Sequence, residues 1–183
     1  DNVIEGCVVE QPGQKSQPYT TTAIAVWNLA TNGGGFVIRD CVVRDVTGGA
    51  GLGQPRSFNA YSAMGRGCEA HNNLASNLNP VSSNYWCSAF YVDSWVGRDI
   101  VVRDNIFLNV YVGIYFSSAG GNTTNLSILN NDITYTGRGI GVEAPKMTRY
   151  MGIRIDGNVV SPAGADAAGE ALRLSGMEQV SAD

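Results

Sequence analysis

Charged residues and histidine are scarce in this sequence. Charged residues make up 15% of the 183, and His71 is the single histidine. The formal net charge is −4, whereas a protein that binds nucleic acid needs a basic face. No apolar run approaches the ~18 residues of a membrane-spanning helix. The composition therefore argues against a nucleic-acid partner and against a membrane span.

Local motifs of metal and cofactor sites are also missing. The sequence has no metal-ligand spacing, no phosphate-cradling glycine loop and no nucleophile elbow. No charged-then-apolar signal peptide opens the chain, because Asp1–Glu10 already alternates as a strand does. We therefore expect no metal and no cofactor.

The sequence instead repeats one phrase six times: apolar, any residue, apolar, two residues, then Asn or Cys, any residue, apolar. Such self-similarity at a few tens of residues is typical of a solenoid, and the alternation inside the phrase indicates a strand. A degenerate copy lies near Asn72 and Leu74. The clear copies carry their turn residue at Cys7, Cys41, Asn105, Asn131 and Asn158.

The spacing of these turn residues fits the coil of a parallel β-helix. Asn105 and Asn131 are 26 residues apart, and Asn131 and Asn158 are 27 apart. That length holds three short strands of ~5–6 residues and three bends. A third apolar strand begins nine residues after Asn105 and after Asn131, at Ile114 and Ile140. We predict an all-β parallel β-helix over 1–183, with about six coils of three short strands.

Stacked coils would bring the turn residues into one column, ~4.8 Å apart. A buried amide there can bond to its neighbours above and below and to the bend backbone, which needs partners. Small thiols would occupy the same place in the first two coils. The expected structural ladder is Cys7, Cys41, Asn105, Asn131 and Asn158.

The third repeat allows two registers. With Asn72 as the turn residue, Glu69 points inward and Leu74 packs. With Asn73, the inward residues are Cys68, Ala70 and Ala75. A buried unpaired carboxylate is costly, which favours Asn73, but the Leu pattern favours Asn72 and both registers stay open.

The sequence leaves the disulfide state of one pair of its four cysteines open. For Cys7 and Cys41, in stacked positions, we expect free thiols; Cys68 and Cys87 flank a large loop and are either a disulfide or two thiols.

The sequence begins with apolar strands, and no capping helix is expected at either end. We expect a single domain that is a segment of a longer solenoid, or that associates end to end with another copy.

The phrase resembles the right-handed parallel β-helix repeat proteins of the pectin-lyase-like superfamily, in particular the generic bacterial ones, from Val3 to about Leu174. The resemblance implies a right-handed solenoid, secreted or at the cell surface. The motifs of its enzyme branches are missing: Arg154-Ile155 is followed by Asp156, and His71 precedes Asn72. We therefore expect a structural or glycan-binding module, with a polysaccharide lyase or glycosidase as the alternative.

Two groups of side chains are candidate sites. Outward residues of the third strands place Tyr91 and Tyr115 on consecutive coils beside Asp93 and Glu143, where a polysaccharide would bind, with Trp86 in an adjoining loop. The alternative is that Tyr91 and Tyr115 have a structural role, as an aromatic pair that stabilises the sheet. In the Asn72 register, His71 would lie between Asp40 and Asp104, which suits acid–base work, although turns select such residues without function. The catalytic candidates are Asp93, Glu143 and His71.

Overall fold

The computed structural model describes residues 2–10, 21–28, 35–47, 58–79, 87–93, 98–117, 123–143, 150–165, 169–175 and 177–182. Their regular structure consists of strands β1 to β17, with no helix in this part of the chain. Every strand pair is parallel. The all-β parallel prediction is confirmed, and no helix among these residues is long and apolar enough to cross a membrane.

The first sheet takes one strand from each repeat. Its order is β1 (Asn2–Glu5), β4 (Phe36–Arg39), β7 (Cys68–His71), β10 (Arg98–Arg103), β12 (Thr123–Leu129), β14 (Tyr150–Asp156) and β17 (Met177–Ala182). Inward residues pair only with inward residues, as Ile4 does with Ile38. A slip of one residue would expose the whole apolar set, so the repeated phrase fixes this register.

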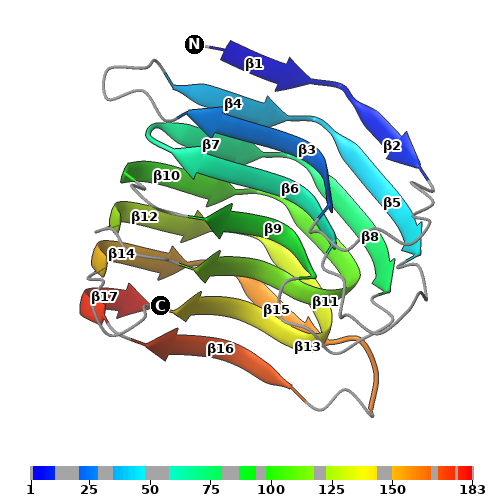
Figure 1. Ribbon diagram of the computed structural model, residues 1–183. Helices are drawn as coiled ribbons and strands as arrows, with labels where there is room; N and C mark the ends of the chain where they lie inside the picture. Colours follow the sequence, from blue (N-terminus) through cyan, green and yellow to red (C-terminus); the bar gives the residue numbers. More distant parts are fainter. Residues whose placement is uncertain are drawn as a thin grey trace.

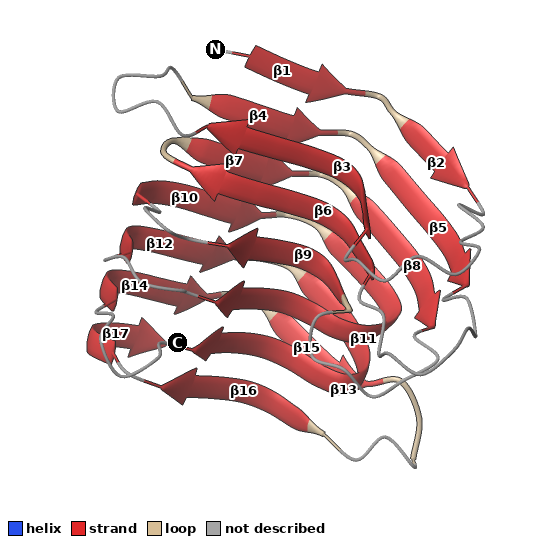
Figure 2. Ribbon diagram, in the orientation of Figure 1, coloured by secondary structure: helices blue, strands red, loops and turns tan. Residues whose placement is uncertain are grey.

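The second sheet has two arms that meet in long bent strands. One arm is β2 (Val8–Glu10), β5 (Val42–Thr47) and β8 (Leu74–Asn79), and the other is β3 (Thr21–Asn28), β6 (Phe58–Gly65) and β9 (Ser88–Asp93). Both arms pair with β11 (Ile106–Ser117). Below it, β13 (Asp132–Glu143) pairs with β15 (Val159–Pro162) and β16 (Glu170–Ser175). Figure 1 shows the strands stacked from the N-terminal to the C-terminal end around one interior, and Figure 2 shows strands joined by loops, with no helix among the described residues.

This nearly closed parallel structure is compatible with a β-helix, but two details differ from the sequence prediction. In β11 and β13 the expected second and third strands form one strand of 12 residues, whose ladder is interrupted by register shifts around Val110. No loop is inserted at the corner between the two expected strands. They therefore form one continuous strand, and only the pairing register shifts at the corner. The chain after Leu174, where the repeat pattern of the sequence ends, contains β17, in which Val180 pairs with Ile153.

A ladder of asparagine side chains follows the bend between the sheets. Asn105 Oδ1 accepts from the backbone N–H and from the Nδ2 of Asn73, both at 3.0 Å. Asn131 Oδ1 accepts the same two bonds from Asn105 at 3.1 and 2.9 Å, and Asn158 accepts them from Asn131 at 2.9 and 2.8 Å. The second Nδ2 hydrogen reaches a carbonyl of the preceding repeat, as from Asn105 to Ala70 at 3.0 Å. The ladder thus satisfies buried bend groups that would otherwise lack partners.

The third repeat adopts the Asn73 register. Asn73 Oδ1 accepts from the Cys41 N–H at 3.1 Å, and its Nδ2 donates to Ile38 at 2.9 Å. Asn72 takes the preceding position, with φ of 55°. That outer position is left-handed in every repeat, and it holds Gly6, Asp40, Asn72, Asp104, Asn130 and Gly157. Glycine, Asn and Asp tolerate this conformation best.

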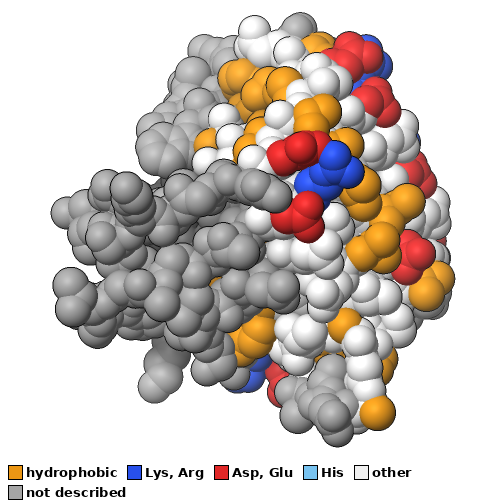
Figure 3. All heavy atoms as spheres, turned by 90° about the vertical axis from the view of Figure 1, so that its right-hand side faces the viewer, with side chains coloured by type: hydrophobic (Ala, Val, Ile, Leu, Met, Phe, Trp, Pro, Cys, Tyr) orange, Lys and Arg blue, Asp and Glu red, His pale blue; other side chains and the backbone are white. Residues whose placement is uncertain are grey.

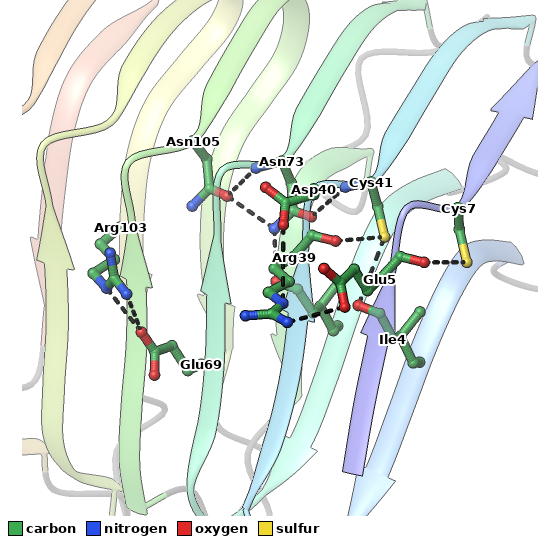
Figure 4. A network of polar contacts seen from close by, with 11 residues as sticks. Ile4, Glu5, Cys7, Arg39, Asp40, Cys41, Glu69, Asn73, Arg103 and Asn105 are labelled. Atoms are coloured by element: carbon green, nitrogen blue, oxygen red, sulfur yellow. Dashed lines mark hydrogen bonds and ion pairs between the residues drawn. The ribbon is translucent and has the colours of Figure 1, made fainter. Parts of the chain in front are cut away.

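Two cysteines occupy the ladder positions of the first two repeats, and the Cys41 thiol contacts the Arg39 carbonyl of its own bend at 3.2 Å. The Cys41 thiol contacts the Ile4 carbonyl at 3.8 Å, which is the bond that Asn73 makes to Ile38 one repeat later. No repeat precedes Cys7 among the described residues, and its thiol contacts the Glu5 carbonyl of its own bend at 3.8 Å. Cys7 is exposed for the same reason, whereas a buried position was expected. Figure 4 shows both thiols beside the ladder.

The four cysteines are thiols that form no disulfide with one another. Burial raises the pKa of Cys68 to about 12 and also raises the pKa of Cys41. Since only the thiolate reacts, a thiol-specific reagent near neutral pH should modify Cys7 alone in the native protein and all four thiols after denaturation. Cys7→Ser should abolish the native reaction. Rapid native modification of Cys68 or Cys87 would contradict this packing.

The outer face of the second sheet carries an apolar column that is broken by charge. Val8, Val42, Leu74 and Ile106 follow one another, and Asp132 precedes Val159. Figure 3 shows hydrophobic side chains on this side of the molecule with acidic and basic ones between them. Mixed surfaces of this kind are ordinary in soluble proteins.

Candidate functional site

The second arm brings the two predicted tyrosines together. Tyr91 pairs with Tyr115 across β9 and β11, and their rings are stacked, with centroids 6.0 Å apart and an interplanar angle of 21°. With Val112 they form a small cluster separate from the main core, because they alternate with inward residues such as Ile114. Both side chains are buried. The pair therefore lies on the outer side of the sheet but is covered.

The next repeat also lies close to the Tyr115 ring. Tyr115 pairs with Gly141 in the next repeat. A Cβ added to Gly141 would lie 3.0 Å from Tyr115 Cδ2 and 3.0 Å from Arg138 Cδ. The missing side chain thus makes room for the stem of Arg138 against the ring. Because Tyr115 is only 7% exposed and its ring stacks on Tyr91, it offers no open face for stacking on a sugar.

Glu143 is the centre of a charged cluster beside the tyrosines. Its Oε2 accepts from the Tyr115 hydroxyl at 3.0 Å, and its Oε1 accepts from Arg138 Nη1 at 2.6 Å. Arg173 Nε lies 3.2 Å from the same Oε1. A carboxylate bonded to two guanidiniums and a phenol is firmly oriented, because charge-assisted hydrogen bonds are the strong ones.

Arg138 supports this cluster from below the surface. Its side chain is only 2% exposed, and its Nη2 lies 3.2 Å from Glu170. A buried guanidinium requires paired carboxylates, and Glu143 and Glu170 supply them. Glu170 and Arg173 are about half exposed, at 54% and 47%, and they form the accessible rim. The cluster therefore has a buried cation and a mixed-charge edge that faces solvent.

Of the predicted ligand-binding residues, Asp93 is placed by its backbone alone and Trp86 is not placed. The backbone of Asp93 pairs with Ser117, which pairs in turn with Glu143. The two acidic residues thus share one column, two steps or ~10 Å apart along the stack. The side chain of Asp93 and all of Trp86 lie outside the described residues.

His71 does not lie between carboxylates. In the Asn73 register it pairs with Arg39 on one side and with Arg103 on the other. Arg39 bonds Glu5 at 2.9 Å and Arg103 bonds Glu69 at 2.8 Å, as Figure 4 shows. His71 Nδ1 is buried and has no hydrogen-bond partner in the described part of the chain. The expected acid–base column is therefore absent, because the shift of one residue puts Asn72 in it.

Sequence reasoning missed Arg138, Glu170 and Arg173. Arg173 was within reach, since it occupies the Tyr91–Tyr115–Gly141 column of the third strands. Arg138 and Glu170 pair with each other at the corner before those strands. Corner positions do not follow the period-2 pattern that sorts inward from outward residues, so the pattern gave no signal for them.

Comparisons with known proteins add no assignment. No protein-family profile, curated protein or solved structure matches this chain. Among the described residues no group of His, Cys, Asp and Glu side chains is arranged to hold a metal ion. The Glu143 cluster is therefore the basis for a proposal about function.

Proposed function

We propose that the chain is a right-handed parallel β-helix of about six coils, and that it is a non-catalytic module that works outside the cell or at the cell surface. Chain order supports the coil: a strand of the first sheet, then one of each arm of the second, repeats along the sequence. Parallel crossovers are right-handed in nearly all proteins. In this proposal the stack is a rigid support, and the Glu143 cluster binds a polysaccharide.

The hydrogen bonds already made by Glu143 are the observation that supports a non-catalytic role. A glycosidase needs one carboxyl group that gives up and regains a proton at the scissile bond. Both oxygens of Glu143 already accept bonds from Tyr115, Arg138 and Arg173. A carboxylate held in this way is a fixed acceptor, so Glu143 is a poor proton shuttle.

The exposed rim supports binding. Glu170 accepts hydrogen bonds and Arg173 donates them, and sugar hydroxyls do both. Because the faces of Tyr115 are covered, the ligand would contact polar edges of the cluster, while Tyr91 and Tyr115 position Glu143. The other proposed contacts are Asp93, from the outward positions of the third strands, and Trp86, from the loop predicted beside them.

Binding and turnover can be measured on the same polysaccharides. We expect a glycan array to show binding, and assays for reducing sugar and unsaturated product to show none. Arg173→Ala should weaken binding at least ~10-fold, the effect of losing about 1.4 kcal/mol. Arg154→Ala, at an exposed arginine of the first sheet, is the matched control. Turnover that is lost in Asp93→Asn or Glu143→Gln would instead identify an enzyme.

A further inference from the structure

Among the described residues, six strands end the parallel stack. They are β1, β2 and β3 at the N-terminal end and β15, β16 and β17 at the C-terminal end. A strand with only one neighbour exposes a row of backbone donors and acceptors, and natural proteins protect such edges with charge, proline or short length. The six edges can therefore be compared by their protection.

Five of these edge strands are protected and one is not. Glu5 lies in β1 and Glu10 in β2, Pro162 ends β15, Glu170 and Arg173 lie in β16, and Glu178 lies in β17. Strand β3 reads TTAIAVWN, without charge or proline. It is also the longest of the six, with 8 residues. Its pairing with β6 over Thr21–Asn28 keeps it extended.

We propose that the edge of β3 that has no neighbour among the described strands pairs with β3 of a second copy of this chain, antiparallel and about a two-fold axis. Each copy carries a net charge of −4, so copies repel at most surfaces. An uncharged strand is the place where this repulsion is least, and an identical strand is complementary to itself in an antiparallel pair. Figure 1 shows β3 at the N-terminal end of its arm.

The buried residues of β3 restrict the register to those in which inward residues face inward residues, and we propose the one centred on Ala25. Ile24 and Val26 face the core, and Ala25 between them is exposed. Directly opposite residues in an antiparallel pair lie on the same face. A register with Ala25 on the two-fold axis places Ile24 opposite Val26 of the second copy and keeps both cores on one side. Pairing Ile24 with Ala25 would bury one and expose the other, which excludes that register.

The mass of the full chain in solution tests this proposal. We expect a dimer, with twice the 19.4 kDa of one chain, that dissociates on dilution. Ala25→Lys should make the protein monomeric, because it sets two like charges ~5 Å apart at the axis. Val8→Lys adds the same charge to an exposed position of β2 at the same end, and it should stay dimeric.

A cross-link keeps the test decisive if the charged variants fold poorly. Across the axis the Cα atoms of Ala25 would be ~4.5–5.5 Å apart, within the range of a disulfide. In a Cys7→Ser background, Ala25→Cys should form a disulfide-linked dimer on mild oxidation, and Val8→Cys should not. A monomeric wild type, assemblies larger than dimers, or an Ala25→Lys dimer would overturn the proposal, as would equal cross-linking of both cysteine variants.

Discussion

Asn131→Leu should lower the free energy of unfolding by about 3–5 kcal/mol, since each buried polar group left without a partner costs ~1–3 kcal/mol. The substitution removes the acceptor of the Asn105 N–H and Nδ2. It also removes the donors to the Val102 carbonyl and to Asn158 Oδ1. The leucine adds apolar surface at a site shaped for an amide, so packing does not compensate. Urea unfolding followed by circular dichroism measures the change.

Asn2→Leu is the matched control, because Asn2 is exposed in β1. The same exchange there should change stability by less than ~0.5 kcal/mol. A loss below ~1 kcal/mol in Asn131→Leu, the worth of one ordinary hydrogen bond, would show that the ladder contributes little beyond filling space.

Arg138→Met should be the second most damaging change, with a loss of about 2–4 kcal/mol. Removing one partner of a buried ion pair costs ~3–5 kcal/mol, and the partial exposure of Glu143 and Glu170 reduces this. Glu143 keeps Tyr115 and Arg173, so the cluster is weakened and not abolished. The same unfolding measurement applies, with the exposed Arg154→Met as control.

The pairing itself can be isolated with a double variant. If Glu143 and Arg138 act as a pair, then Arg138→Met combined with Glu143→Gln should cost less than the two single changes together. Strict additivity would mean that Arg138 stabilises the fold through its packing against Tyr115, and that the ion pair at 2.6 Å is incidental.

The repeated phrase predicted the first sheet because side-chain period, turn residue and stacking all depend on the same residues. Ile38 and Cys41, or Ile128 and Asn131, can be assigned inward without knowing any other part of the chain. The third repeat was ambiguous because Asn72 and Asn73 adjoin and both suit a bend. The structure resolves it through the small inward residues Cys68 and Ala70, which are buried. A sequence pattern looks for the most apolar residues at inward positions. In this repeat the inward positions hold small residues instead.

The candidate site was predictable only along strands. Tyr91, Tyr115 and Glu143 follow from the period of two, and their columns are those expected. That the tyrosine faces are covered could not be foreseen, because it depends on the absent side chain of Gly141 and on the path of Arg138 from the corner. Two 12-residue strands and the extra strand β17 were missed because they lack the turn signals that marked the other repeats.

The most direct test of the central claim is the distance between two residues at opposite ends of one column. Val8 and Val159 are both more than 60% exposed, and five parallel pairings connect them through Val42, Leu74, Ile106 and Asp132. Spin labels at Val8→Cys and Val159→Cys, in a Cys7→Ser background diluted with unlabelled protein, should give one narrow distance near 24 Å, from five steps of ~4.8 Å. A broad distribution, or a distance far above this value, would contradict the stacked parallel fold.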